Sequence, residues 1–280
     1  MCHKFKIILL LCSFIVASSG TAQEAVSPNG KFATINGLKI YYEESGQGMP
    51  VILLHHFFAT ASLWKTYAPE LAKKYRVIAV DLPGHGRTDY MDTTKVFLHK
   101  EAAEYIIGLI DFLKLDSVYL MGASGGGTIT LYLATLRPEL VKRAVVIGGF
   151  IYRPKQVQKI LASWSKDPDA TEIASHGKEK AILLHKQFIY FSQLYGDPSF
   201  TPEALSTILA KTLIIHGDND QLAPISNALE MYQNIPNVYL WIVPNGGHLP
   251  LPPYIDPKNE RDFVKRTMEF LNGDWDKKIF

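Results

Sequence analysis

The pentapeptide GASGG at residues 122–126 constrains this chain more than any other stretch, because it fits G-x-S-x-G between a predicted strand and a predicted helix. Residues 118–121 are apolar and rich in β-formers, and residues 128–136 have apolar positions that suit a packed helix. Side chains flanking so tight a turn would collide with the strand or the helix, which explains the glycines. The alternative is a glycine-rich turn with an incidental serine. The strand–turn–helix context favours a nucleophile elbow with Ser124 at its tip.

The base and the acid that a serine nucleophile needs are found downstream, in two loops that follow predicted strands. His248 comes after an apolar strand at residues 239–243, and Asp218 and Asp220 come after an apolar strand at residues 213–215. Open parallel sheets place their ligands at the carboxyl ends of strands, so these side chains are expected to meet Ser124 there. The order serine, acid, histidine along the chain predicts a catalytic triad.

Four segments together resemble the α/β-hydrolase fold family, and in particular its lid-bearing serine esterases and related hydrolases, from about Gly37 to the C-terminal helix. They are an apolar strand ending in His55-His56, the loop DLPGHGRT at residues 81–88, the elbow, and the two loops that carry the acid and His248. The resemblance implies an α/β class fold: a mostly parallel sheet with helices on both faces and a helical lid insertion.

The resemblance also implies roles for individual residues. It makes Ser124 the nucleophile, His248 the general base and Asp220 the acid that orients the histidine. Asp218, two residues earlier, is the alternative acid. Serine chemistry requires no cofactor and no metal, and the sequence has no metal signature such as H-E-x-x-H, so neither is expected.

The oxyanion hole is expected to be formed by two backbone N–H groups, those of Gly125, directly after the nucleophile, and of Phe57. One neighbouring position departs from the family pattern: where the family has His-Gly, this chain has His55-His56. A histidine at residue 56 is expected to shift the oxyanion loop or to add a titratable group to the pocket. The alternative is that His56 packs elsewhere or faces solvent.

Short apolar strands alternate with helices on both sides of the elbow, which predicts a parallel sheet covered on both faces. Asn36-Gly37 predicts a hairpin between strands at 32–35 and 39–43. The further elements before residue 150 are strands at 51–55, 77–81 and 143–147 and helices at 61–73 and 96–113. The alternation resumes at Thr212, with helices at about 225–233 and 258–271. We therefore expect a hydrolase core made of residues 23–149 and 210–280.

Residues 150–209 interrupt this alternation and are expected to form a helical cap, or lid, over the active site, where lid-type hydrolases carry theirs. Helix-like stretches occur at 156–164 and 180–193. The segment is rich in aromatic residues, namely Phe150, Tyr152, Trp164, Phe188, Tyr190, Phe191, Tyr195 and Phe200. Most of these rings are expected to hold the cap to the sheet, and a few to roof the cleft, which favours an apolar acyl or aromatic substrate.

Residues 1–22 have the pattern of a secretory signal peptide: lysines, an apolar run at 7–17 and small residues before a cleavage site after Ala22. A retained anchor or lipid attachment at Cys12 are the alternatives. The mature chain would be exported, to the periplasm or the extracellular space, with no stable membrane span after cleavage. Both cysteines, Cys2 and Cys12, lie in this segment, so the mature chain would have no disulfide.

The charge balance gives no electrostatic case for nucleic acid as a partner. The chain has 29 Lys and Arg residues against 27 Asp and Glu residues, and signal cleavage would remove Lys4 and Lys6. The expected partner is a small ester-like molecule.

The leading hypothesis is an exported serine hydrolase that cleaves a carboxylic ester of a small, largely apolar substrate through an acyl-enzyme. The alternatives are a lactone, thioester, amide or C–C bond hydrolase of the same fold, or a protein that binds a small molecule without turnover.

Overall fold

The computed structural model describes residues 27–90, 97–163, 167–193 and 197–276 of the chain. The predicted signal peptide, residues 1–22, lies outside the described residues, as do Trp164 and Tyr195 of the aromatic set. No helix within the described ranges is long and apolar enough to cross a membrane.

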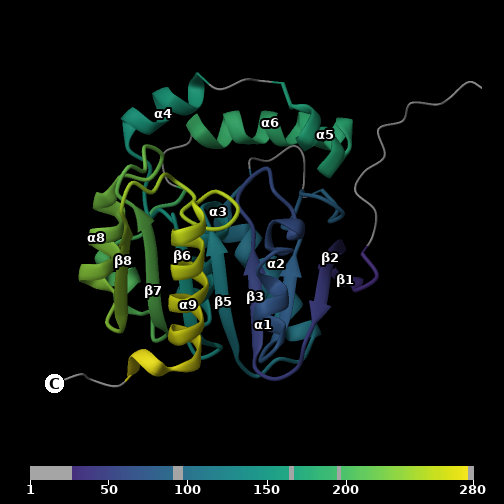
Figure 1. Ribbon diagram of the computed structural model, residues 1–280. Helices are drawn as coiled ribbons and strands as arrows, with labels where there is room; N and C mark the ends of the chain where they lie inside the picture. Colours follow the sequence, from purple (N-terminus) through teal and green to yellow (C-terminus); the bar gives the residue numbers. More distant parts are fainter. Residues whose placement is uncertain (1–26, 91–96, 164–166, 194–196, 277–280) are drawn as a thin grey trace, which may run out of the picture.

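An eight-stranded sheet forms the centre of the described part of the molecule, in the order β1-β2-β4-β3-β5-β6-β7-β8 (Figure 1). From β4 and β3 to β8 the neighbouring strands are parallel, whereas β1 pairs with β2 and β2 with β4 antiparallel. The predicted mostly parallel sheet is therefore confirmed. The strands are β1 (Gly30–Ile35), β2 (Leu38–Ser45), β3 (Pro50–Leu54), β4 (Arg76–Val80), β5 (Val118–Ala123), β6 (Val141–Ile147), β7 (Lys211–Gly217) and β8 (Val238–Val243).

The hairpin between β1 and β2 has the predicted two-residue turn. Asn36 and Gly37 both have positive φ, 49° and 84°, as a turn matched to the twist of the strands requires. Ile35 pairs with Leu38, which puts both apolar side chains on the buried side.

Helices cover both faces of the sheet, as expected. On one face α2 (His99–Phe112), α3 (Gly125–Leu136) and α8 (Ile225–Asn234) bury their apolar side chains against the strands. On the other face η1 (Ala61–Trp64), α1 (Ala68–Ala72) and α9 (Pro257–Asn272) do the same. The central strands are apolar on both sides for this reason, and four of the five residues of β3 are fully buried.

The predicted helix at 61–73 is instead two short pieces, η1 and α1. The Thr60 side chain accepts a hydrogen bond from the N–H of Ser62 and starts η1. Pro69 lies in the first turn of α1, where its missing N–H costs no helical hydrogen bond, so a new helix begins there. Apolar spacing alone did not predict this break.

The segment 150–209, which we call the inserted segment, contains α4 (Lys155–Ala162), α5 (Ala170–His176), α6 (Lys178–Gln193) and α7 (Pro202–Ser206). In Figure 1 α4, α5 and α6 lie across the end of the sheet where the parallel strands terminate. Sequence patterns predicted α4 and α6 but not α5, which starts with a capping box between Asp169 and Glu172. Residues 200–208 instead pack into the core through Phe200, Leu205 and Ile208.

Candidate active site

Ser124 occupies a strained turn between β5 and α3. Its backbone angles, φ 51° and ψ −117°, are rare for a residue with a side chain. The turn is held by the Ser124 N–H, which donates to the carbonyl of Ile147 on β6 at 2.7 Å, and by the Ser124 carbonyl, which accepts from the N–H of Thr128.

Two glycines of the pentapeptide are required by close backbone contacts. A Cβ at Gly122 would lie 2.1 Å from the carbonyl oxygen of Gly126, and a Cβ at Gly126 would lie 2.4 Å from that of Leu54. Any side chain at either position would push the elbow out of the sheet. The sequence therefore uses glycine here to bring strand, turn and helix into contact.

The structure brings Ser124, His248 and Asp220 together in one hydrogen-bonded chain. Ser124 Oγ lies 2.7 Å from His248 Nε2, and His248 Nδ1 lies 2.9 Å from Asp220 Oδ2. The carboxylate can only accept, so Nδ1 of the histidine carries the proton, and Nε2 is free to accept the proton of the serine hydroxyl. This is the arrangement in which a histidine removes a proton from a nucleophile.

Asp220 is buried and its carboxylate is held by several donors. Its Oδ1 accepts from the N–H groups of Leu222 and Ala223 at 2.8 and 2.9 Å. Burial by itself raises the pKa of Asp220, but the hydrogen bond and charge of His248, with the N–H of Ala223, hold the pKa below its ordinary value. The alternative acid, Asp218, is exposed, and the contacts of His248 Nδ1 are with Asp220.

The two expected oxyanion donors lie next to each other. A Cβ built on Gly125 would be 3.9 Å from the backbone nitrogen of Phe57 and 3.2 Å from Nε2 of His99. Gly125 is the first residue of α3, so its N–H is one of those that no helical carbonyl accepts. Phe58, directly after Phe57, has φ 68°, which shows how sharply the chain turns at this loop.

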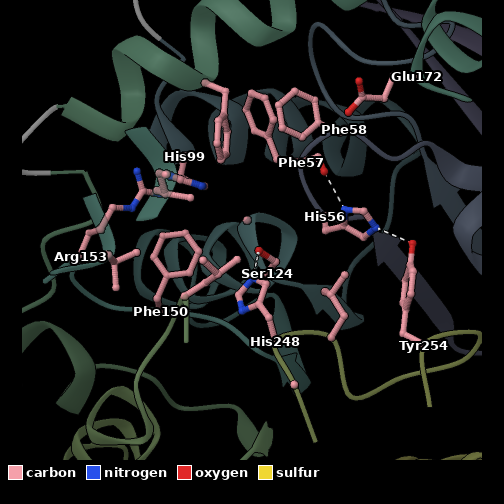
Figure 2. Close-up of a pocket in the computed structure, with 17 residues that line it drawn as sticks. His56, Phe57, Phe58, His99, Ser124, Phe150, Arg153, Glu172, His248 and Tyr254 are labelled. Atoms are coloured by element: carbon pink, nitrogen blue, oxygen red, sulfur yellow. Dashed lines mark hydrogen bonds between the residues drawn. The ribbon is translucent and has the colours of Figure 1, made fainter. Parts of the chain in front are cut away.

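His56 lines the same cavity and is held from two sides (Figure 2). Its Nδ1 lies 2.6 Å from the carbonyl oxygen of Phe57, and its Nε2 lies 3.1 Å from the Tyr254 hydroxyl. Nδ1–H therefore donates to the carbonyl and Nε2 accepts from the phenol. Burial, more than the charge of His248, lowers the pKa of His56 to about 4, so this histidine is neutral near pH 7.

The cavity in front of Ser124 has a volume of about 470 Å³ and is mainly apolar. All three helices α4, α5 and α6 contribute to its wall, through Leu161, Glu172 and Phe188. Sequence patterns did not identify four polar residues that also line it, His99, Arg153, Glu172 and Tyr254. Arg153 follows the carboxyl end of β6, the kind of position that made Ser124, Asp220 and His248 candidates, so the same rule could have found it.

His99 belongs to a buried polar cluster beside the elbow. Its Nδ1 lies 2.8 Å from Asp197 Oδ2, which also accepts the His99 backbone N–H at 2.9 Å, and Tyr132 donates to the other oxygen of the carboxylate at 3.2 Å. Burial acts to raise the pKa of Asp197, but the interactions with His99 and Tyr132 hold it below the ordinary value. This contact spans about a hundred residues of sequence and leaves no local pattern.

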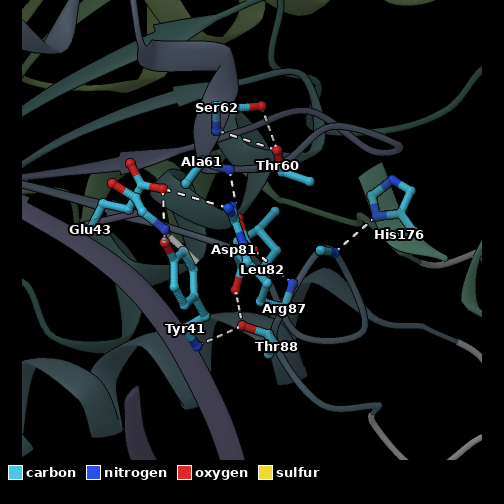
Figure 3. A network of polar contacts seen from close by, with 12 residues as sticks. Tyr41, Glu43, Thr60, Ala61, Ser62, Asp81, Leu82, Arg87, Thr88 and His176 are labelled. Carbon is cyan, nitrogen blue, oxygen red and sulfur yellow. Dashed lines mark hydrogen bonds and ion pairs between the residues drawn. The ribbon is translucent and has the colours of Figure 1, made fainter. Parts of the chain in front are cut away.

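The loop at residues 81–88 is a structural support for the site and not part of the cavity wall (Figure 3). The buried Asp81 carboxylate accepts two hydrogen bonds from the Arg87 side chain, at 2.8 and 2.9 Å, and one from the N–H of Ala61 at 2.7 Å. His55 Nε2 accepts a hydrogen bond from the N–H of Leu82 at 2.9 Å, which joins this loop to the segment that carries Phe57. These bonds explain why an arginine follows the aspartate, and Gly86 is needed because a Cβ there would lie 2.2 Å from Asp81 Oδ2.

Comparison with known families gives one match: residues 49–171 fit the family described as "alpha/beta hydrolase fold". A hydrolase of Bacillus subtilis named YugF, described as uncharacterized, is 24% identical over 86% of this chain and 100% of its own length. A 2-hydroxy-6-oxo-6-(2'-aminophenyl)hexa-2,4-dienoic acid hydrolase of Metapseudomonas resinovorans is 26% identical, over 86% of this chain and 90% of its own.

Among solved structures, a meta-cleavage product hydrolase from Pseudomonas fluorescens superimposes with a TM-score of 0.72. The alignment covers 88% of this chain and 98% of that one at 24% identity. An identity this low supports the shared fold and leaves the substrate open.

Proposed function

We propose that this chain, whose residues 49–171 match the α/β-hydrolase fold family, acts through Ser124 as a serine hydrolase of that fold. The proposed substrate is a carboxylic ester of a small, largely apolar acid or alcohol. The observation that carries the proposal is the continuous chain of hydrogen bonds from Ser124 Oγ through His248 to Asp220.

In the proposed reaction Ser124 Oγ attacks the ester carbonyl carbon while its proton moves to His248 Nε2. The negative charge that develops on the carbonyl oxygen is stabilised by the N–H groups of Gly125 and Phe57, each worth ~3 kcal/mol of the barrier in comparable sites. The C–O bond to the alcohol then breaks, and the alcohol leaves with the proton from His248. The product of this half-reaction is an acyl-enzyme.

Water completes the cycle. His248 takes a proton from the water as its oxygen attacks the acyl carbon, and the same proton returns to Ser124 Oγ as the acid is released. Asp220 keeps its charge throughout, since its low pKa disfavours protonation, and it stabilises the positively charged imidazole in both steps.

The proposal extends to the inserted segment and to the destination of the chain. Val157, Leu161 and Phe188 come from α4 and α6 and form much of the apolar wall, which supports a lid that selects apolar groups. Export to the periplasm or the extracellular space rests only on the sequence pattern of residues 1–22.

A second candidate reaction is hydrolysis of a C–C bond next to a ketone. It is favoured by the relative from Metapseudomonas resinovorans, whose name describes a 2-hydroxy-6-oxo-dienoic acid as substrate. The same triad would serve both reactions, because each passes through attack at a carbonyl carbon. The leaving group differs: a carbon in place of an oxygen must accept the proton.

A panel of 4-nitrophenyl esters of increasing acyl length, run beside a 2-hydroxy-6-oxo-dienoate, tests both candidates. We expect turnover of short and medium acyl esters that is lost in Ser124→Ala. Turnover of the dienoate at a much higher kcat/KM than any ester would favour the second candidate. If the wild-type protein turns over neither class but binds such compounds, it is a binding protein and the proposal is wrong.

A further inference from the structure

One wall of the cavity carries a positive charge that the proposed ester chemistry does not use. Phe150 and Arg153 follow the carboxyl end of β6, and both line the cavity that contains Ser124. The guanidinium carbon of Arg153 lies 5.1 Å from the centre of the Phe150 ring. In the view of Figure 2, Arg153 and Phe150 are on one side of Ser124, and His56 and Tyr254 are on the other.

The position of Arg153 disfavours its charged form, because burial removes part of the water around the guanidinium. Partial burial lowers the pKa of Arg153 to about 10, so the guanidinium loses part of its hydration but is still charged at pH 7. A desolvated charged side chain in a cavity next to a nucleophile is typical of a binding site.

The charge of Asp197 opposes the loss of the proton from Arg153. Asp197 accepts hydrogen bonds from the backbone and side chain of His99 and from Tyr132. His99 packs edge-on against Phe150, with ring centres 5.5 Å apart, so this cluster contacts the ring on which Arg153 stacks. Arg153 and Phe150 line the cavity on the same side of Ser124, where a ligand in the cavity would meet them.

We propose that Arg153 is a specificity-determining residue that binds a carboxylate of the substrate. The substrate is then an ester, or a ketone of the second candidate reaction, that carries a free carboxylate separated from the reacting carbonyl by a short apolar spacer along Phe150. A guanidinium matches a carboxylate with two parallel hydrogen bonds, and it stacks on an aromatic ring without losing that capacity. This inference rests on the proposed function, because it names a group on the substrate of the same site.

Pairs of esters that differ only in charge test the proposal. Monoethyl succinate, glutarate, adipate and suberate place a carboxylate on the acyl side, with ethyl alkanoates of equal length as neutral partners. 3-Carboxyphenyl butyrate and phenyl butyrate do the same for the alcohol side. In one of these series we expect the wild-type protein to prefer the charged ester.

The substitution Arg153→Gln should remove this preference. We expect kcat/KM for the preferred charged ester to fall about ten- to hundred-fold more than for its neutral partner, the range for loss of a hydrogen bond to a charged group. Arg153→Lys should retain part of the preference. Arg266→Gln is the control, because it removes the same charge from the exposed side of α9, where Arg266 lies over Trp241. It should leave the ratio of kcat/KM for the charged ester to kcat/KM for its neutral partner unchanged.

A binding measurement keeps the two proposals separate and does not depend on turnover. Calorimetric titration of glutarate and adipate into Ser124→Ala should show saturable binding that Arg153→Gln in the same background abolishes. If both wild type and Arg153→Gln hydrolyse the esters, and the ratio of kcat/KM for the charged ester to kcat/KM for its neutral partner is the same in both, the role of Arg153 is wrong. The proposed function would then still stand. Arg153-dependent binding without hydrolysis of any ester or dienoate would overturn the proposed function and leave the carboxylate site standing.

Discussion

The sheet and the inserted segment hold their functional side chains in different ways. In the sheet, Ser124 and Asp220 are fixed by backbone groups: the Ile147 carbonyl holds the elbow, and two N–H groups hold the carboxylate. The inserted helices contact the rest of the molecule through side chains. His176 accepts the N–H of Gly86 and donates to the Phe58 carbonyl, and Lys180 donates to two carbonyls of the loop at 86–88.

The difference in attachment implies different roles for the two regions, the proposed reaction for the loops that follow the strands and the choice of substrate for the inserted helices. The elbow at Ser124 is held by bonds between main-chain atoms, which survive most substitutions, so this residue keeps its geometry while the sequence around it changes. Contacts that depend on single side chains are lost with one substitution, and the helices that they hold provide Val157, Leu161 and Phe188 of the cavity wall. We therefore expect substitutions in the sheet to lower kcat, and substitutions in the inserted segment to change mainly KM and substrate preference.

The largest effect is expected at the elbow. Ser124→Ala and His248→Ala should each reduce kcat for a short ester by roughly 10⁴-fold or more, since triad residues act as a unit. Thr135→Ala removes a hydroxyl from the same helix, α3, where it bonds only the Tyr132 carbonyl among the described contacts, and serves as the control. Steady-state kinetics at saturating ester measure kcat. Retention of more than about a hundredth of wild-type kcat in Ser124→Ala would exclude it as nucleophile.

The second effect distinguishes two aspartates of one turn. Asp220→Asn should lower kcat by up to ~10⁴-fold, because an asparagine favours the wrong histidine tautomer and cannot stabilise its positive charge. Asp218→Asn changes an exposed side chain and should have little effect. The same assay compares both variants, with circular dichroism as the check on folding. A larger loss in Asp218→Asn would contradict the geometry around His248.

Much of the fold could be predicted from the sequence because its signals are local. The glycines of the elbow, the Asn36-Gly37 turn and the apolar strands each depend on neighbouring residues, and the structure has all three. Ser124, His248 and an acid at residue 218 or 220 could also be named in advance, since each follows the carboxyl end of a strand, and the family resemblance selected Asp220.

The rest of the site depends on packing between distant segments. The contact of His99 with Asp197 and the bond between His56 and Tyr254 join residues that are far apart in the sequence, and they have no counterpart in local spacing. The eight aromatic residues of the inserted segment illustrate the same limit. Their spacing does not distinguish Phe150 and Phe188, which line the cavity, from Tyr190, which is exposed.

A smaller effect is expected where the inserted segment is attached. Lys180 Nζ lies 2.8 Å from the Gly86 carbonyl oxygen and 2.7 Å from that of Thr88. Lys180→Met should loosen α6 and raise KM several-fold, with kcat changed by less than about twofold. Lys186→Met removes the same charge from an exposed position of α6 and is the matched control. A fall in kcat with unchanged KM would show that this attachment serves the chemistry and not the cavity.

The smallest effect is expected at His56, where the chain departs from the pattern of the family that it resembles. Its pKa of about 4 means that it gains a charge only in acid, as the pH falls through that value. The kcat/KM profiles of wild type and His56→Gly should therefore have the same shape above about pH 5 and differ only below it. A difference in shape between about pH 6 and 7 would show that His56 titrates in its ordinary range.

The most direct test of the account is to find which residue a serine-directed fluorophosphonate modifies. The reagent forms a stable bond to an activated serine oxygen, and mass spectrometry of the digested protein locates the adduct. We predict one adduct, on the peptide that contains Ser124, formed rapidly in wild type and in Lys180→Met and slowly in Asp220→Asn. An adduct on another residue, or equal labelling rates in wild type and Asp220→Asn, would contradict the claim that His248 and Asp220 activate Ser124 as the nucleophile.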